Sequence, residues 1–139
     1  MAMSGLVADK AIDRMGIAPG ELILSVGFDS DCDSDLLEAA QTRSGEPVRH
    51  GKTDEVVDVV LLWWREGDGD LVDDLVDALT YLSESGPLWL LTPKAGIAGH
   101  VEPSDIQDAA PTAGLTATVT FLAAPEWSAS KLVARKKYP

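Results

Sequence analysis

A stretch of ten residues, Glu55 to Trp64, constrains the fold of this chain more than any other. Its sequence is EVVDVVLLWW, and eight of the ten residues are apolar. A continuous apolar run that is rich in valine and bounded by polar turns is typical of a strand buried on both faces. Such strands belong to parallel sheets that helices cover on both sides. The sequence therefore predicts an α/β fold built around this strand.

The segments on either side extend this strand into a parallel sheet. Gly69 to Ser85 has leucines at helical spacing, and Leu88–Thr92 is a second buried apolar run, so the two complete a βαβ unit. Glu21–Val26 predicts a further strand. We expect Glu21–Val26, Val56–Trp64 and Leu88–Thr92 to lie side by side and parallel. Further segments are predicted as helices at Leu6–Met15, Leu36–Ala40 and Pro103–Ala110, with a short edge strand at Val48.

The C-terminal part of the chain predicts an antiparallel hairpin. Thr116–Ala123 alternates threonine with apolar residues, and Lys131–Arg135 predicts the returning strand. We expect the returning strand to lie between Leu88–Thr92 and Thr116–Ala123. The whole chain, 1–139, is then a single domain with a three-layer, Rossmann-like fold, and residues 131–139 form a basic terminal strand and tail.

Composition excludes several classes of function. The net charge is −12, and the tail carries +4, which leaves −16 on residues 1–130. An acidic body of this size repels phosphate backbones, so we expect no nucleic-acid partner. No apolar run approaches the roughly 20 residues of a membrane span, so we expect no membrane. Cys32 is the only cysteine, which favours a cytoplasmic protein without disulfides.

Several short sequences together resemble a known family. They are MGIAPG at Met15–Gly20, the strand VVDVVLLWWR, LLTPKAG at Leu90–Gly96, HVEPSDI, PTAGL and the C-terminal pattern WSxxKLVxRK. The set resembles an uncharacterised family of small actinobacterial proteins, a domain of unknown function. The resemblance implies a compact α/β domain, and it brings no activity or catalytic residue.

More remotely, the order of the elements is similar to a shortened methyltransferase-type Rossmann sheet, which ends in an antiparallel hairpin. The turn after the first strand departs from that type, because it offers Gly27 alone, followed by Phe28 and aspartates. A dinucleotide or S-adenosylmethionine site requires a glycine-rich turn there. The acidic ribose-binding residue also has no clear counterpart around His50–Asp54. We therefore expect no cofactor.

Four alternating aspartates follow the first strand: Asp29, Asp31, Asp33 and Asp35. Counted from Asp29, an EF-hand-like loop requires glycine at the sixth position and glutamate at the twelfth, where this chain has Ser34 and Ala40. We interpret the aspartates as helix-capping residues and predict no metal. Cys32 should be a poor nucleophile among these charges, and no catalytic motif is present, so the sequence gives no indication of an enzyme.

Arg65 and Lys94 are the only Lys or Arg residues between Thr53 and Ser130. Each follows a parallel strand, so both should lie at the carboxyl edge of the sheet, where open α/β sheets bind ligands. They bind an anionic group there or neutralise neighbours such as Glu66, Asp29 or Asp31, and the excess of acidic groups nearby favours neutralisation. The glycines at positions 96 and 99 predict a mobile loop after Lys94. We define the candidate rim as Gly27, Asp29, Asp31, Arg65, Lys94, His100, Trp127 and Ser128.

These observations favour a small acidic protein that acts as a non-catalytic protein-binding or regulatory domain, with another protein as partner. The alternative is a degenerate methyltransferase-like domain that binds a small anionic metabolite. The rim is a binding patch only if Trp127 is accessible and at least one of Arg65 and Lys94 lacks an acidic partner. The sequence leaves the partner's identity and the oligomeric state open.

Overall fold

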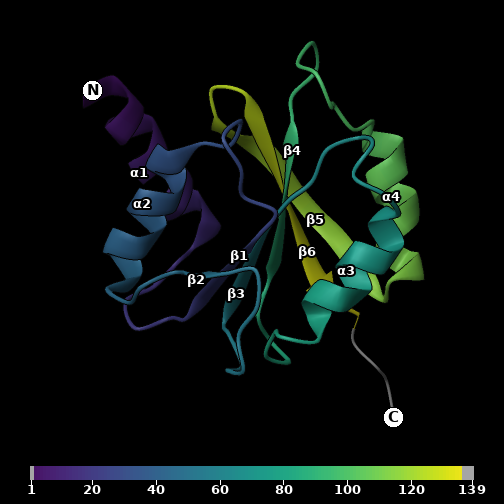
Figure 1. Ribbon diagram of the computed structural model, residues 1–139, viewed down its shortest axis with the longest axis horizontal. Helices are drawn as coiled ribbons and strands as arrows, with labels where there is room; N and C mark the ends of the chain where they lie inside the picture. Colours follow the sequence, from purple (N-terminus) through teal and green to yellow (C-terminus); the bar gives the residue numbers. More distant parts are fainter. Residues whose placement is uncertain (1, 136–139) are drawn as a thin grey trace.

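A computed structural model describes residues 2–135 and contains one six-stranded mixed sheet with helices on both faces (Figure 1). The elements, in chain order, are α1 (Ala2–Met15), β1 (Ile23–Val26), α2 (Ser34–Ser44), β2 (Arg49–His50), β3 (Val59–Trp63), α3 (Leu71–Leu79), β4 (Leu88–Pro93), α4 (Pro103–Thr112), β5 (Leu115–Ala124) and β6 (Trp127–Ala134).

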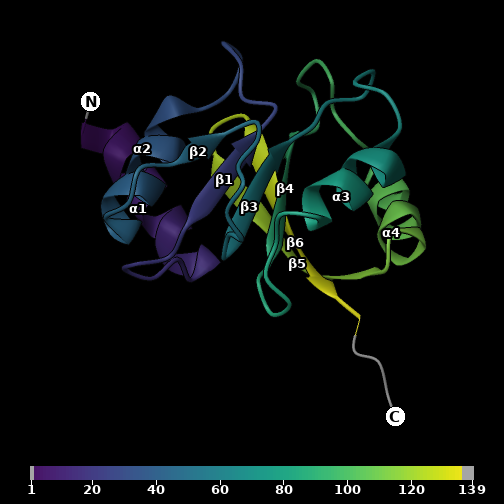
Figure 2. The same ribbon diagram turned by 60° about the horizontal axis from the view of Figure 1, so that its bottom comes forward.

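The strand order is β2-β1-β3-β4-β6-β5, which confirms the predicted arrangement (Figure 2). Strands β1, β3 and β4 are parallel neighbours, and β2 pairs in parallel with β1 at the edge. Strand β6 is antiparallel to both of its neighbours and lies between β4 and β5. The hairpin thus ends the sheet as the methyltransferase-type comparison required.

All five residues of β3 are buried, so the central strand is covered on both faces as predicted. The strand is shorter than the Val56–Trp64 run because its first residues have other roles. Val56 is 67% exposed, and the Asp58 carboxylate accepts a hydrogen bond from the Leu22 N–H at 2.8 Å. The continuous apolar run therefore predicted the strand correctly. The hydrogen bond between Asp58 and the residue before β1 lies just ahead of the point where β3 begins.

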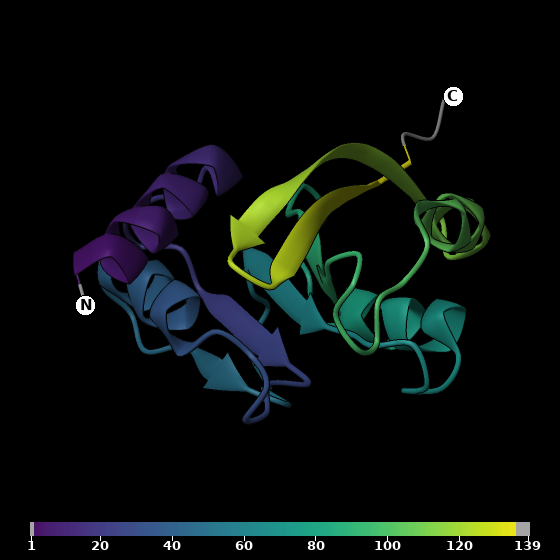
Figure 3. The same ribbon diagram turned by 90° about the horizontal axis from the view of Figure 1, so that it is seen from above.

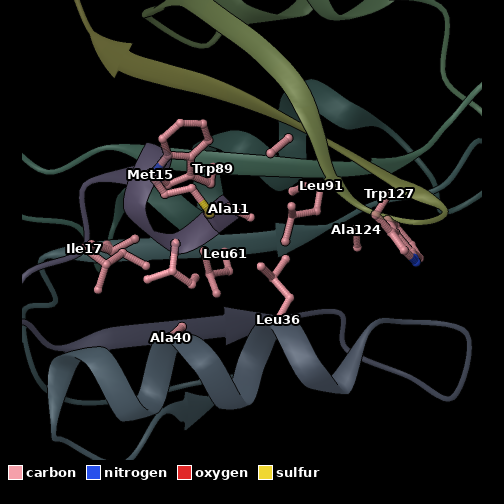
Figure 4. Packing of buried hydrophobic residues seen from close by; sticks show 14 of the residues in the cluster. Ala11, Met15, Ile17, Leu36, Ala40, Leu61, Trp89, Leu91, Ala124 and Trp127 are labelled. Atoms are coloured by element: carbon pink, nitrogen blue, oxygen red, sulfur yellow. The ribbon is translucent and has the colours of Figure 1, made fainter. Parts of the chain in front are cut away.

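Helices α1 and α2 cover one face of the sheet and α3 and α4 cover the other, which gives the three predicted layers (Figure 3). Alternate residues of β3 enter the two cores: Trp63 packs on the α1–α2 side and Leu62 on the α3–α4 side, where Trp64 follows directly after the strand. In the first core, Leu36 of α2 points towards Leu61 and Leu91 of the sheet (Figure 4). The sheet, with a packed core on each face, thus supports the loops that leave its carboxyl edge.

Of the four alternating aspartates, Asp33 has the predicted capping role, since it accepts the Leu36 N–H at the start of α2. At the start of α3, Asp70 accepts the Asp73 N–H in the same way. Helix α3 nevertheless ends at Leu79, well before the predicted Ser85. The reason is tertiary, because the backbone around residues 81–83 forms hydrogen bonds with Val57 at 2.8 and 2.9 Å in place of further helical turns.

The hairpin is longer than predicted. Strand β6 begins at Trp127, directly after the turn at Pro125 and Glu126, so the predicted strand Lys131–Arg135 is its second half. Two register shifts in the β5–β6 pairing each leave one extra residue on β5. Such bulges coil the ribbon and interrupt the edge. Lys136 and Lys137 of the predicted tail lie outside the described residues.

Candidate functional site

The loops after β1, β3 and β4 meet at the carboxyl edge of the sheet, together with the turn of the hairpin (Figure 2, upper edge). This places the candidate rim residues at the same end of the sheet. Their side chains, however, do not form one open patch. Gly27, Asp31 and Trp127 pack around Arg65. Lys94, His100 and Ser128 lie around the end of β4, and Asp29 stays in the loop after β1.

The Arg65 guanidinium joins the β1 loop to the β3 loop. It forms a bidentate pair with the Asp31 carboxylate, with N–O distances of 2.8 and 2.7 Å. It also donates to the Gly27 carbonyl at 3.0 Å and pairs with Asp68 at 3.2 Å. The hydrogen bonds from Arg65 hold the pKa of Asp31 below its usual range, and the Asp31 contact raises the pKa of Arg65. Arg65 therefore neutralises the acidic loop, which is the second of the two roles that its position allowed.

Trp127 is 3% exposed, so it offers no accessible surface to a partner. Its indole N–H donates to the Asp31 carbonyl at 3.0 Å, and its ring meets Trp63 edge to face at 5.0 Å. The Arg65 guanidinium carbon lies 5.4 Å from the ring centre. The expectation of an exposed tryptophan on the rim requires correction, because the β1 loop folds over the hairpin turn and encloses this side chain.

Position 27, in the turn after β1, requires glycine. Its φ is +83°, and a Cβ added there would lie 2.4 Å from the Trp63 carbonyl oxygen. In a Rossmann turn, glycine lets the backbone approach a bound phosphate. In this chain the close approach is made to the protein's own β3 backbone.

The segment after Lys94 is held in place rather than free. The Gly99 carbonyl accepts the Glu66 N–H at 2.9 Å, and the Lys94 N–H donates to the Glu126 carbonyl at 3.0 Å. His100 donates from Nδ1 to the Pro93 carbonyl at 2.9 Å. These bonds tie the loop to both neighbouring turns, so we expect less motion than its glycines alone predict.

Lys94 is half-buried and forms no ion pair with any residue between 2 and 135, whereas Arg65 is fully committed. Asp29 is exposed, and its carboxylate accepts only the Ser30 N–H in the described part of the chain. Ser128 lies apart from both, facing a small cavity beside α4. The rim thus retains a single uncommitted cation and no accessible aromatic side chain.

Cys32 lies beside Asp31 and receives a hydrogen bond from Arg65 at 2.9 Å. Burial, the largest cause, raises the pKa of the thiol to about 11. Cys32 is therefore a poor nucleophile, as the sequence suggested, although loss of hydration contributes more than the neighbouring charge. Among residues 2–135, no group of three or more His, Cys, Asp or Glu side chains is arranged to hold a metal ion.

Sequence reasoning missed a larger cavity, which we call the switch-point crevice. It has a volume of 330 Å³ and lies on the α3 side of the sheet. The helices that follow β1 and β3 cover opposite faces, so the crevice opens at the point where the direction of winding reverses. This is where open α/β sheets bind ligands. Its lining residues are Val26, Gly27, Gly51, Lys52, Leu62, Trp63, Trp64, Asp68, Asp74, Asp77, Ala78 and Tyr81.

The crevice is open because residues 51–58, between β2 and β3, form no helix that could cover this face of β1. Its wall repeats at helical spacing, with Asp74, Asp77 and Ala78 on α3 and Tyr81 just after the helix. That spacing was visible in the sequence, but the leucine stripe on the same helix was the stronger signal. The Asp74 carboxylate is fixed by the Trp64 indole N–H at 2.8 Å.

Comparison of the sequence with known families and proteins gives a consistent result. The family described as "Protein of unknown function (DUF3052)" matches residues 12–136. The uncharacterized protein Rv2239c of Mycobacterium tuberculosis is 50% identical over 123 residues, which cover 88% of this chain and 77% of the relative. Neither comparison assigns an activity.

Two solved structures with a similar fold are described as methyltransferases. An S-adenosylmethionine-dependent methyltransferase from Aquifex aeolicus aligns with a TM-score of 0.58 at 11% identity, covering 91% of this chain and 89% of that one. The O-methyltransferase NcsB1 of neocarzinostatin biosynthesis aligns with a TM-score of 0.68 at 13% identity, covering 91% of this chain and 52% of that one. At this identity the likeness shows the fold alone.

Proposed function

Because the chain belongs to the DUF3052 family, whose description names no activity, we propose its function from the geometry: a non-catalytic binding domain that holds a small, positively charged ligand in the switch-point crevice. The observation that carries the proposal is the crevice itself, a 330 Å³ hollow at the topological switch point. Ligand sites are typically concave, largely apolar and equipped with a few convergent polar groups. A cytoplasmic location belongs to the proposal and is supported by the single cysteine.

The polar groups of the crevice select the sign of the ligand's charge. Three carboxylates line it, Asp68, Asp74 and Asp77, against one cation, Lys52. Asp68 is paired with Arg65, whereas Asp77 forms no ion pair with any residue in the described part of the chain. A small anion would meet net repulsion here, so we revise the anionic metabolite of the sequence-based alternative to a cation. The apolar floor, which includes Val26 and Leu62, suits the ligand's hydrocarbon part.

The test compares two probes of similar shape and opposite charge, phenethylamine and 3-phenylpropionate, by NMR. The Trp64 indole N–H reports on the crevice because it is bonded to Asp74. The Trp89 indole N–H is an internal control, because Trp89 packs in the core on the α1–α2 side of the sheet and does not line the crevice. We expect phenethylamine to shift the Trp64 signal saturably and to leave the Trp89 signal in place. An equal or stronger response to 3-phenylpropionate, or none to either probe, would overturn the proposal.

Two variants locate the charge effect. Asp77→Asn should weaken phenethylamine binding about fivefold, the loss of one charge-assisted hydrogen bond. Asp73→Asn is the matched control, since Asp73 is exposed on the same helix and does not line the crevice. Equal weakening by both variants would indicate long-range attraction to an acidic protein and no defined site.

A second candidate, binding of a partner protein, rests on the exposed edge of β5. The ten residues Leu115–Ala124 include no charged side chain, although 24% of the whole chain is charged. Val119 and Leu122 on this strand are 49% and 54% exposed. An uncharged edge strand with exposed apolar residues is a common place for another chain to add. Partners captured by the native protein and lost on Leu122→Asp would support this candidate, and partners unaffected by that change would exclude this edge.

A further inference from the structure

Besides its carboxylates, the switch-point crevice has one positive charge that the proposed function leaves without a role. Lys52, in the loop after β2, lines the crevice and forms no ion pair with any residue between 2 and 135. Glu55, on the same loop, is already paired with Arg49 at 2.7 Å. The ammonium group of Lys52 is therefore available to a bound molecule.

A backbone amide adds a second donor on the same side of the crevice. The Gly51 N–H donates to the Ser25 carbonyl at 2.8 Å, so the backbone polar groups of Ser25 face the loop after β2. Because these groups alternate in direction along a strand, the Gly27 N–H, two residues further on, faces the same way. It forms no hydrogen bond within residues 2–135, and Gly27 lines the crevice. An ammonium group and an amide N–H on one side suit a carboxylate.

The wall on α3 has the opposite charge. Asp74 and Asp77 are three residues apart on this helix, so their side chains are neighbours, and both line the crevice. The Trp64 indole N–H donates to one oxygen of Asp74 at 2.8 Å, which leaves the other oxygen open. The third carboxylate, Asp68, is neutralised by Arg65. Two carboxylates are therefore available to cationic groups of a ligand.

The charges left available in the crevice are thus two negative and one positive. A complementary ligand has two cationic groups and one carboxylate. The apolar floor, which includes Val26 and Leu62, further requires a hydrocarbon segment between the charged groups. Basic α-amino acids have this pattern, because a methylene chain separates the second cationic group from the α-ammonium and the α-carboxylate.

We propose that the switch-point crevice binds a basic α-amino acid. Its two cationic groups contact Asp74 and Asp77, and its carboxylate contacts Lys52 and the Gly27 N–H. This assignment rests on the proposed function and names the class of the positively charged ligand, whose net charge balances that of the crevice. A carboxylate is favoured over a phosphate dianion, because a single lysine faces it and the two aspartates would repel the second charge.

The experiment titrates the full chain with L-lysine, cadaverine and L-norleucine. The Trp64 indole N–H is followed by NMR, with the Trp89 indole N–H as the internal control. Cadaverine has both ammonium groups of L-lysine without the carboxylate, whereas L-norleucine has the carboxylate without the side-chain ammonium group. We expect L-lysine to bind about fivefold more tightly than either analogue, because each analogue loses charge-assisted hydrogen bonds on one side of the crevice.

A variant of Lys52 separates the carboxylate contact from general attraction of cations. Lys52→Met removes the charge and keeps the hydrocarbon stem of an exposed side chain, so the fold should persist. It should weaken L-lysine binding about fivefold and should not weaken cadaverine binding, which involves no carboxylate. Lys10→Met is the matched control, since Lys10 is exposed on α1 across the sheet and the net charge changes equally. It should preserve the preference for L-lysine.

The outcomes distinguish this assignment from the proposed function. Equal affinities for L-lysine and cadaverine, or equal weakening of both by Lys52→Met, would overturn the amino-acid assignment. The cation-binding function would still stand in that case if phenethylamine shifts the Trp64 signal. Equal weakening of L-lysine binding by Lys52→Met and Lys10→Met would likewise exclude a carboxylate contact at Lys52. No saturable Trp64 shift with L-lysine, cadaverine or phenethylamine would overturn both the assignment and the proposed function.

Discussion

At the scale of single residues, Arg65 decides what the carboxyl edge can do. It contacts Asp31, Asp68 and the Gly27 carbonyl, and only 17% of its side chain is exposed. An arginine placed to meet a ligand's anionic group is instead used to hold two loops together. The charge that remains available at this edge is therefore mostly negative.

The Arg65–Asp31 pair predicts a pH-dependent stability. The folded-state pKa of Asp31 is lowered, so the carboxylate stabilises the fold above its unfolded pKa of about 4, and this contribution is lost as pH falls through the folded-state pKa. Because Asp31 is half exposed, we expect Asp31→Asn to cost only about 1 kcal/mol at pH 7. The cost should shrink as pH falls below about 4 and through the folded-state pKa of Asp31, as measured by urea unfolding. Asp29→Asn, in the same loop and without an ion pair in the described chain, is the control variant.

Gly27 predicts a second effect at this scale. Gly27→Ala should destabilise the protein for two reasons, a φ of +83° and a clash with the Trp63 carbonyl oxygen. Gly114→Ala isolates the first reason, since its φ is +84° and nothing lies within 4 Å of the added Cβ. We expect about 1 kcal/mol for Gly114→Ala and at least about 2 kcal/mol more for Gly27→Ala, by thermal or urea unfolding. Equal losses would mean that the β1 and β3 backbones separate easily.

At the scale of elements, the connections explain the site better than the strands do. The chain between β2 and β3 forms no helix, which leaves the switch-point crevice open. The loop from Lys94 to His100, by contrast, is bonded to the β3 loop and to the hairpin turn. The edge thus has an open crevice on one side of Arg65 and a fixed loop on the other.

This fixed loop predicts restricted motion. Amide order parameters for residues 95–99 should be close to those of the strands, about 0.85, in ¹⁵N relaxation measurements. The Glu66 amide, which donates to the Gly99 carbonyl, should be protected from hydrogen exchange. Gly99→Ala should release it, because the new Cβ would lie 3.0 Å from the Arg65 Cβ at a φ of +86°. Order parameters below 0.6 in the native protein would favour the mobile loop that the glycines alone suggest.

At the scale of the whole molecule, the chain has a methyltransferase-like sheet order without the backbone geometry of a cofactor turn. The net charge of the chain is −12, and the largely buried cation Arg65 is paired with Asp31 within the protein. No helix in the part of the chain described by the structure is long and apolar enough to cross a membrane. The fold therefore supplies a scaffold with a crevice, and the side chains that line the crevice give it an excess of carboxylates.

This combination predicts weak or no binding of S-adenosylmethionine and of dinucleotides. The space beside Gly27 is occupied by the Trp63 carbonyl, and the ion pair between Arg65 and Asp31 holds the loop after β1 in place. Isothermal titration calorimetry should show no saturable heat at micromolar ligand. NcsB1, whose structure contains S-adenosylmethionine, serves as the positive control. A micromolar dissociation constant for this chain would mean that the β1 loop opens, and would restore the cofactor-binding alternative.

The sequence alone determined the elements and their order, because those depend on neighbours in the chain. The valine-rich run located β3, the aspartates before α2 and α3 located their caps, and the alternation at Thr116–Ala123 located the hairpin. Only the tertiary structure decided the use of the charges and aromatics. Several acidic residues lie near Arg65 in the sequence, but the partner that it binds most closely, Asp31, is 34 residues away. Trp127 is enclosed by that same loop, 96 residues distant, so its burial has no local signature in the sequence. Both cavities likewise arise where side chains from separate strands and a helix meet, which is a property of the sheet register and of which faces the helices leave open.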